Sequence, residues 1–239
     1  MTNLITNPSP RRIARIAGSL YLAFIVTFAF SSFAYSKFIV PEDASATAAN
    51  ILASEWFFRM ACISELLSAV LFLLAAWALY TLLKPVNKDF AMLFMLLNLA
   101  GVTVECISVL NQFAALLLLS APHYLKIFQV GQLQAASMLF LKLHTYGFMI
   151  AQIVYGAWLF PLGYLVLKSG FLPRLLGVLL ILDCSCWLAY FFQFFLFPGY
   201  KAITYLSFPL AFIVEFSFSL WLAFKGTKNT EDRTEINRL

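Results

Sequence analysis

Residues 139–156, LFLKLHTYGFMIAQIVYG, place polar side chains inside a long apolar run. With its flanks, the run exceeds the about 20 residues that a helix needs to cross a membrane. Lys142, His144 and Gln152 nevertheless lie within it. An ionisable side chain in lipid is costly, so such a residue marks a functional site by default. We therefore interpret this stretch as the central helix of a membrane bundle, with Lys142 and His144 at the mouth of its polar interior.

The composition of the whole chain is that of a membrane protein. Of 239 residues, 62% are hydrophobic and 11% are charged, whereas soluble domains contain about 45–50% and about 25%. A soluble fold of this length could not cover so much apolar surface. The four cysteines all lie in apolar runs, which argues against a disulfide framework.

Six apolar runs each fit one membrane span, which predicts an all-α bundle of six transmembrane helices. The predicted spans are Ile13–Tyr35, Glu55–Leu83, Phe90–Leu119, Ser137–Leu167, Arg174–Phe197 and Ala202–Phe224. We expect residues 1–226 to form one domain and residues 227–239 to form a polar cytoplasmic tail. The first run is longer than the roughly 7–15 apolar residues of a signal peptide, so we expect it to stay in the protein.

Lys and Arg are unequally distributed over the loops that these spans define. The side that carries both termini holds 11 of them, and the other side holds 3. The positive-inside rule therefore predicts that both termini are cytoplasmic. We expect the protein to lie in the plasma membrane. Because this distribution explains the net charge of +5, the charge is no evidence for nucleic-acid binding. Membrane lipid is the partner that we expect.

Two longer connections lie on the outer side of the predicted membrane. The first, Ser36–Ser54, contains an alanine-rich piece that we expect to form a short helix at the membrane interface. The second, Ser120–Ala136, contains Pro122 and Gly131. We expect the two connections to cap the outer end of the bundle in part, and flexible connectors are the alternative.

Polar residues within the spans recur at steps of three and four, so they share helix faces. In the third span they are Asn98, Gly101, Glu105, Ser108 and Gln112, and in the fifth they are Asp183, Cys186, Tyr190 and Gln193. A polar face toward lipid would be costly, so we expect both faces to turn toward the bundle interior.

The depth of the charged residues follows from a helix rise of about 1.5 Å per residue. By this estimate, Arg59 and Glu105 lie at the same depth as His144, near the outer end of the bundle. We favour an ion pair between Arg59 and Glu105. The other acids fall nearer the middle, where they could join helices by hydrogen bonds, be neutral or hold a cation. The candidate ligand-binding residues are Arg59, Glu65, Glu105, His144, Asp183 and Glu215.

The two basic residues of the fourth span have simpler roles as well. Lys142 is close enough to the predicted membrane surface for its ammonium group to reach water. His144 has no second histidine within a span, so we expect a hydrogen-bonded interior residue rather than a metal or haem ligand. We expect neither a metal nor a cofactor. Gly147 leaves room for another helix to approach beside His144.

Five segments between Arg12 and Gly226 are together typical of one known family. They are ATAANILAS (46–54) with Arg59 downstream, YTLLKPVNK (80–88), FLKLHTYGF (140–148), LGYLVLKSGFLPRLLGVLL (162–180) and LWLAFKG (220–226) after Glu215. In these segments the chain resembles a bacterial family of multi-pass integral membrane proteins catalogued only as a domain of unknown function. The resemblance implies six helices and a membrane location but supplies no activity. Lys142 stands where an acidic or neutral residue is expected, which leaves Arg59, His144 and Glu215 as the better candidates for a shared role.

We expect a non-enzymatic protein that binds a small amphipathic molecule or lipid in an outward-opening polar cavity. Arg59 and His144 would hold the polar head, and the acids would line the interior. The motifs of phosphate-binding loops, zinc proteases and serine hydrolases do not occur. One alternative is an intramembrane enzyme acting on a lipid or isoprenoid, with His144 as its base, and another is a structural or regulatory subunit without a ligand. Six spans are few for a transporter acting alone, and a homodimer could supply the rest.

Overall fold

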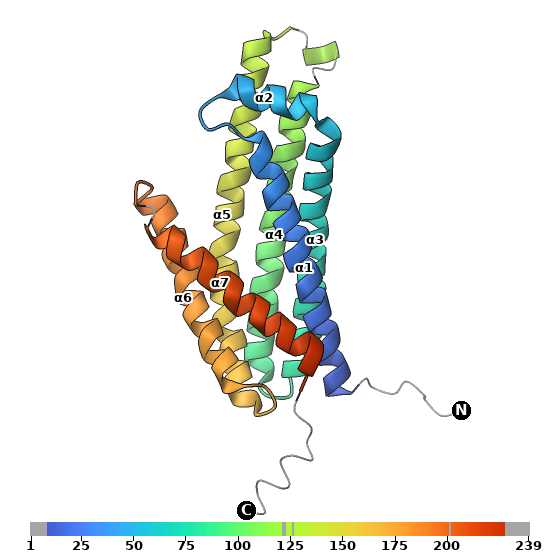
Figure 1. Ribbon diagram of the computed structural model, residues 1–239, viewed down its shortest axis with the longest axis vertical. Coiled ribbons are helices and arrows are strands. Elements are labelled where there is room, and N and C mark those ends of the chain that lie inside the picture. The colour runs from blue at the N-terminus through green and yellow to red at the C-terminus, as the bar shows by residue number, and fades with distance from the viewer. Residues whose placement is uncertain (1–8, 121–122, 126, 201, 228–239) are drawn as a thin grey trace, which may run out of the picture. The chain divides into compact units, whose positions relative to one another are not determined.

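The computed structural model describes residues 9–120, 123–125, 127–200 and 202–227, and all regular structure in these ranges is helical. The helices in Figure 1 are α1 (Pro10–Phe38), α2 (Ala44–Ala53), α3 (Glu55–Leu83), α4 (Lys88–Leu119), η1 (His123–Leu125), α5 (Val130–Ser169), α6 (Arg174–Leu196), α7 (Ala202–Leu220) and the π-helix η2 (Trp221–Lys225). The predicted all-α fold is confirmed. The predicted tail lies outside the described residues, except for Thr227.

Among the described residues, five helices are long and apolar enough to cross a membrane, namely α1, α3, α4, α5 and α6. Large apolar side chains are exposed on them, such as Trp77, Ile107 and Leu110 at 59%, 59% and 64%. Exposed apolar surface on this scale fits contact with lipid rather than with water. The chain is therefore a multi-pass membrane protein. The sixth predicted span falls on α7 and η2 and stays a prediction.

The helices divide into two compact units. The first contains residues 1–22, 71–100 and 152–239, and the second contains residues 23–70 and 101–151. The long helices α1, α3, α4 and α5 contribute residues to both units, whereas α2 belongs to the second and α6 and α7 belong to the first.

The short helix predicted in the first outer connection is α2, which belongs to the second unit. Asp43 begins it, because its carboxylate accepts a hydrogen bond from Ala46 N at 2.8 Å. Thr47 bonds to the backbone of Val40, and Asn50 Nδ2 donates to Phe38 O at 3.2 Å. These bonds tie α2 to the end of α1, and Figure 1 shows α2 lying crosswise to the long helices.

The helix α5 begins at Val130, seven residues before the predicted start of the fourth span at Ser137. Gln132 Oε1 accepts a hydrogen bond from Gln129 N at 2.9 Å, and Leu133 N donates to Gln129 O at 3.2 Å. This is half of a capping box, in which the third helical residue satisfies the backbone N–H that precedes the helix. Gln132, which lies within the predicted connection Ser120–Ala136, is therefore part of the first turn of the helix.

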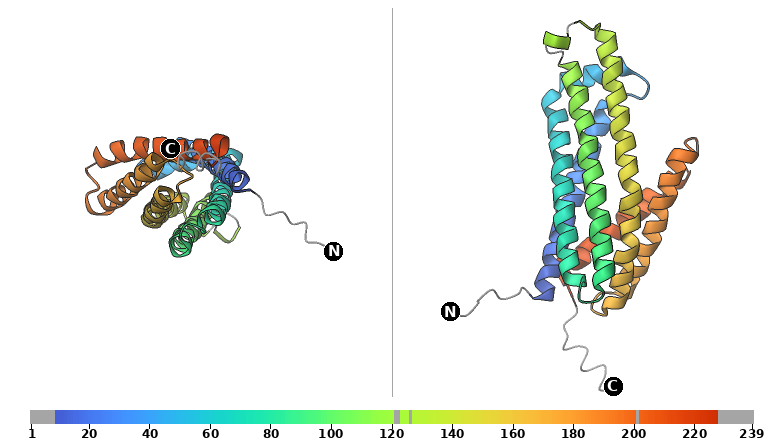
Figure 2. Two further views of the ribbon diagram at one scale, coloured as in Figure 1. Left: turned by 90° about the horizontal axis from the view of Figure 1, so that it is seen from below. Right: turned by 180° about the vertical axis from the view of Figure 1, so that it is seen from behind.

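In the first unit, glycines allow helix backbones to touch. A Cβ atom on Gly18 of α1 would lie 2.3 Å from Ala223 N of η2. A Cβ atom on Gly163 of α5 would lie 2.8 Å from Gly177 O of α6. Small residues at such crossings give the close van der Waals packing that holds membrane helices together. The helices α6 and α7 also pack against each other (Figure 2).

Candidate functional site

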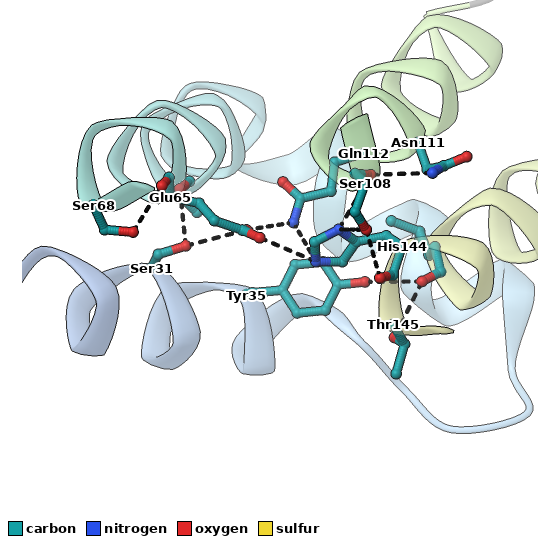
Figure 3. Close-up of polar contacts among 11 residues, drawn as sticks. Ser31, Tyr35, Glu65, Ser68, Ser108, Asn111, Gln112, His144 and Thr145 are labelled. Carbon is teal, nitrogen blue, oxygen red and sulfur yellow. Dashed lines mark hydrogen bonds and ion pairs between the residues drawn. The ribbon is translucent and has the colours of Figure 1, made fainter. Parts of the chain in front are cut away.

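Polar side chains from four helices meet in the interior of the second unit (Figure 3). We define the polar network as Ser31 and Tyr35 of α1, Glu65 of α3, Ser108 and Gln112 of α4, and His144 of α5. The side chains of Glu65 and His144 are only 6% and 7% exposed. Buried polar groups cost free energy unless they are hydrogen-bonded, so the partners of each group decide what the network can do.

Gln112 lies at the centre of the polar network. Its Nε2 donates to Glu65 Oε2 at 2.8 Å and lies 2.8 Å from His144 Nε2. The two hydrogens of an amide nitrogen suffice for both contacts. The direct distance from Glu65 Oε1 to His144 Nε2 is longer, at 3.6 Å. The Gln112 amide, rather than a direct ion pair, therefore links the acid to the imidazole.

His144 is held on three sides. Because Gln112 donates to Nε2, this nitrogen is an acceptor, and the proton of a neutral imidazole is on Nδ1. Nδ1 lies 3.3 Å from the acceptor Ser108 O. The Tyr35 ring packs edge-on against the imidazole, with 5.2 Å between the ring centroids. The prediction of a hydrogen-bonded interior histidine is confirmed.

The buried Gln112 Oε1 of the polar network has no hydrogen-bond partner among the described residues. Exchanging the amide oxygen and nitrogen would leave the NH₂ group in that place instead. A buried polar atom without a partner costs about 1–3 kcal/mol. The network therefore presents an unused acceptor next to the Glu65 carboxylate.

An apolar cluster covers the polar network on the side of α2. Its buried members include Phe38, Ile51, Phe58, Leu116 and Leu141. Along each long helix these residues lie about one or two turns closer to α2 than the network residues of the same helix. The outward-opening cavity that we predicted is thus closed at this end in the structure.

Gly147 sets the distance between α4 and α5 beside the network. A Cβ atom at this position would lie 2.5 Å from Ser108 Oγ and 2.9 Å from Ser108 Cβ. The close approach that we predicted for Gly147 is confirmed. It lets Ser108 Oγ donate to His144 O at 2.7 Å, which fixes α4 against the turn of α5 that carries the imidazole.

Ser108, His144 and Glu65 lie in the order of a catalytic triad, but their hydrogen bonds do not match one. Ser108 Oγ donates to the carbonyl of His144 at 2.7 Å and lies 3.2 Å from its Nδ1. An activated serine needs to donate to the imidazole, and it needs N–H groups for the oxyanion. Ser108 lies in the middle of α4, where backbone N–H groups bond within the helix. This geometry does not favour Ser108 as a catalytic nucleophile.

The first unit holds a second polar cluster, which contains two of the predicted site acids. Tyr21 OH donates to Glu215 Oε2 at 2.6 Å, and Trp187 Nε1 donates to Glu215 Oε1 at 3.3 Å. Asp183 is fully buried, at 0% exposed. The six candidate residues are therefore divided between the two units, and of the four in the second unit Glu65 and His144 form part of the polar network.

The predicted depth layers are wrong for Glu65 and His144, which lie within 3.6 Å of each other. The error comes from the start of α5. Because the helix begins at Val130, His144 is about 21 Å along it rather than near its outer end. Glu65 is about 15 Å along α3, so the two side chains can meet.

The favoured ion pair between Arg59 and Glu105 is also wrong. Arg59 Nη2 lies 2.7 Å from Glu55 Oε1, one turn earlier on the same helix, and the Arg59 side chain is 44% exposed. Glu105 is buried on the inner face of α4. Lys142 Nζ likewise pairs with the exposed Glu42 at 2.9 Å, which agrees with its predicted position near water.

A family model described as a domain of unknown function, DUF4386, matches residues 16–226. The chain belongs to this family. The chain is 30% identical over 157 residues to an uncharacterized protein of Archaeoglobus fulgidus. The matched region covers 65% of this chain and 77% of that protein. No solved structure matches the chain. The predicted resemblance to a family of unknown function is confirmed.

The sequence also carries a signal for two network residues of this DUF4386 chain that we did not predict. Thr27, Ser31 and Tyr35 recur at steps of four in α1 and share a face. This pattern was sufficient to predict a third polar face. In the part of the chain that the structure describes, no group of three or more His, Cys, Asp or Glu side chains is placed to hold a metal ion.

Proposed function

We propose that this protein is a six-span plasma-membrane protein that binds the hydrogen-bond-donating head of a small amphipathic molecule at the polar network. The observation that carries the proposal is the buried Gln112 Oε1, which lacks a partner in the described ranges. It lies on the same amide that contacts the Glu65 carboxylate. A hydroxyl or ammonium group between these acceptors would recover about 1–3 kcal/mol, the cost of the unpaired atom.

The surroundings of the polar network fit the apolar part of such a ligand. The apolar cluster lies on the α2 side, and stacked rings of Phe28 and Phe148, with centroids 5.8 Å apart, belong to the same unit. Ligand sites in proteins are commonly apolar with a few placed polar groups that orient the ligand. A hydrogen-bonding head and an apolar tail match this combination.

Displacement of α2 is the route by which we expect the site to open outward. Ile51 of α2 is the member of the apolar cluster that would leave with it. The displacement would break the ion pair between Glu42, which precedes α2, and Lys142 of α5. This pair is exposed, and such surface pairs contribute about 0–1 kcal/mol. This ion pair therefore adds little resistance to ligand entry, and the bonds of Thr47 and Asn50 keep α2 attached to the end of α1 during the movement.

The meeting of the two ends of the helical chain in the first unit supports the six-span arrangement. Arg15 Nη2 of α1 donates to Phe224 O of η2 at 3.3 Å. A Cβ atom on Gly226 would lie 3.0 Å from Arg11 Cγ. If both ends lie at one membrane surface, the number of crossings is even, so α7 with η2 would form the sixth. The basic residues near both ends favour the cytoplasmic surface.

Reporter fusions in a bacterial host test this topology. We expect a fluorescent protein that folds in the cytoplasm to be active at either terminus, and alkaline phosphatase to be inactive at both. As a control, phosphatase fused after Ser120, in the predicted outer connection, should be active. An active phosphatase at the C-terminus together with a fluorescent N-terminus would mean an odd number of crossings and would contradict the proposal.

Amphiphiles with one tail and different heads test the binding site. Dodecylamine and dodecanol have donor heads, whereas methyl dodecanoate has only acceptors. We expect the two donors to raise the unfolding temperature of the purified protein by about 4 °C at a tenfold excess over their dissociation constants. Methyl dodecanoate should have little effect, because it leaves Gln112 Oε1 unpaired.

A double variant, Glu65→Leu with Gln112→Leu, provides the matched comparison. It removes both acceptors and leaves no buried carboxylate behind, so we expect it to fold and to lose the response to the donor heads. Asn111→Leu, on the same helix as Gln112, should keep that response. Equal shifts in unfolding temperature for donor and acceptor heads, or an unchanged shift in the double variant, would contradict the proposal.

A further inference from the structure

The cluster of Tyr21, Trp187 and Glu215 in the first unit is arranged around a negative charge. Both oxygens of the Glu215 carboxylate accept a hydrogen bond, from Tyr21 OH at 2.6 Å and from Trp187 Nε1 at 3.3 Å. Donors to both oxygens, one of them short, suit an ionised carboxylate.

Asp183 provides a second and independent observation. It is 0% exposed, and neither of its carboxylate oxygens has a hydrogen-bond partner in the described part of the chain. It lies one turn before Trp187 on α6, and Trp187 Nε1 donates to Glu215, so Asp183 faces the same cluster. A buried carboxylate with neither a donor nor a counter-charge is strongly unfavourable, so its charge needs a partner.

The described side chains around Asp183 do not supply that partner. The titratable groups that interact with it are Tyr21 of α1, Glu215 of α7, and the thiols of Cys184 and Cys186 on its own helix. Each of these is neutral or negative. Among the described residues, the ion pairs of Lys and Arg join Arg59 to Glu55 and Lys142 to Glu42.

We propose that Asp183 and Glu215 together hold one small monovalent cation, either an alkali ion or a proton, beside the Tyr21 hydroxyl. One positive charge would neutralise Asp183 and remove its repulsion from Glu215. Oxygen atoms are also the ligands that hard cations prefer. The Tyr21 ring packs against the rings of Phe72 and Trp158, with centroids 5.5 and 6.3 Å away, which favours a small ion over an organic ammonium. This cation site is additional to the proposed ligand site of the second unit.

Thermal unfolding of the purified protein in detergent tests the cation site in two arms. In the first, NaCl or KCl replaces N-methyl-D-glucamine chloride at constant ionic strength and alkaline pH. In the second, the pH is lowered in N-methyl-D-glucamine chloride alone. We expect one arm to raise the unfolding temperature by about 4 °C at a tenfold excess of the ion over its dissociation constant. A response to salt identifies an alkali ion, and a response to pH alone identifies a proton.

Asp183→Asn keeps the shape of the side chain and removes its charge, so this variant should lose the responding arm. Its unfolding temperature in the alkaline, N-methyl-D-glucamine baseline should exceed that of the unsubstituted protein, because the buried charge is gone. The control is Asp89→Asn, which makes the same change at an exposed position in the first turn of α4 and should retain the full response.

Three results would overturn the cation site. They are no response of the unsubstituted protein in either arm, an equal response in Asp183→Asn, or an equal loss in Asp89→Asn. If Asp183→Asn does not fold, Glu215→Gln makes the same comparison at the second carboxylate. The Glu65→Leu, Gln112→Leu double variant should keep the cation response, so failure of the proposed ligand site and failure of this site are distinguishable.

Discussion

Replacing Gln112 with leucine should lower the free energy of unfolding by about 3 kcal/mol, a large fraction of the stability of a typical domain. Leucine cannot donate to Glu65 Oε2 or to His144 Nε2, each 2.8 Å away from the amide nitrogen. Among the described residues, the Glu65 carboxylate would keep the weak hydrogen bond from Ser31 Oγ at 3.5 Å. Leaving a buried charged group without its partner costs about 3–5 kcal/mol. Denaturant unfolding in mixed micelles measures the loss.

The control for this substitution is Asn111→Leu, which removes the neighbouring amide of α4. Asn111 is only partly buried and donates one bond, to Ser108 O at 3.1 Å. We expect this change to cost about 1 kcal/mol or less. If Asn111→Leu lowered the free energy of unfolding as much as Gln112→Leu, the effect could not be assigned to the central position of Gln112 in the polar network.

Adding Glu65→Leu to Gln112→Leu should recover part of the lost stability. The second substitution removes the carboxylate that the first leaves unpaired, and replacing both partners of a buried polar pair is often close to neutral. We expect a coupling energy of about 1–3 kcal/mol between the two positions. Simple additivity of the two single effects would contradict the view that Glu65 depends on Gln112.

Gly18→Ala should also cost about 3 kcal/mol, because the new methyl group has no space. It would lie 2.3 Å from Ala223 N and 2.7 Å from Ser219 O. Both neighbours are backbone atoms of α7 and η2, so no side-chain rotation can relieve the contact, and the helices must separate. Overpacking typically costs about 1–3 kcal/mol and occasionally more. Thermal unfolding in detergent measures the effect.

Gly131→Ala is the matched control for this substitution. Its new Cβ atom, near the start of α5, meets nothing within 4 Å. Alanine is a better helix former than glycine by about 1 kcal/mol, so this variant should be as stable as the unsubstituted protein or slightly more stable. If Gly18→Ala behaved in the same way, η2 would not pack on α1 as described, and the support for an even number of spans would be lost.

The polar face of α4 is an example of what periodicity predicts well. Asn98, Glu105, Ser108 and Gln112 were expected on one inward face, and all four are buried. Spacing at three and four residues determines a helix face, whatever the helix packs against. The five long apolar helices follow from composition for a similar reason, since the need to bury backbone polar groups in lipid leaves few other structures.

Contacts between helices could not be predicted in the same way. The depth of His144 depended on where α5 begins, and the capping bond from Gln129 N to Gln132 moved that start to Val130. Arg59 found a nearer partner in Glu55, one turn away on its own exposed helix face. An error of seven residues in one helix end is about 10 Å of depth, which is enough to place two contacting residues in different layers.

The sequence by itself determined the class of the protein, five of its long apolar helices and the inward face of α4, because these depend on composition and on the period of one helix. Only the tertiary structure decided which polar groups meet. Gln112 joins Glu65 and His144, which are 47 and 32 residues away along the chain. Tyr21 and Glu215 meet across 194 residues. Such contacts depend on helix ends, rotations and close approaches like that at Gly147, and these are set by the packing of whole helices against one another.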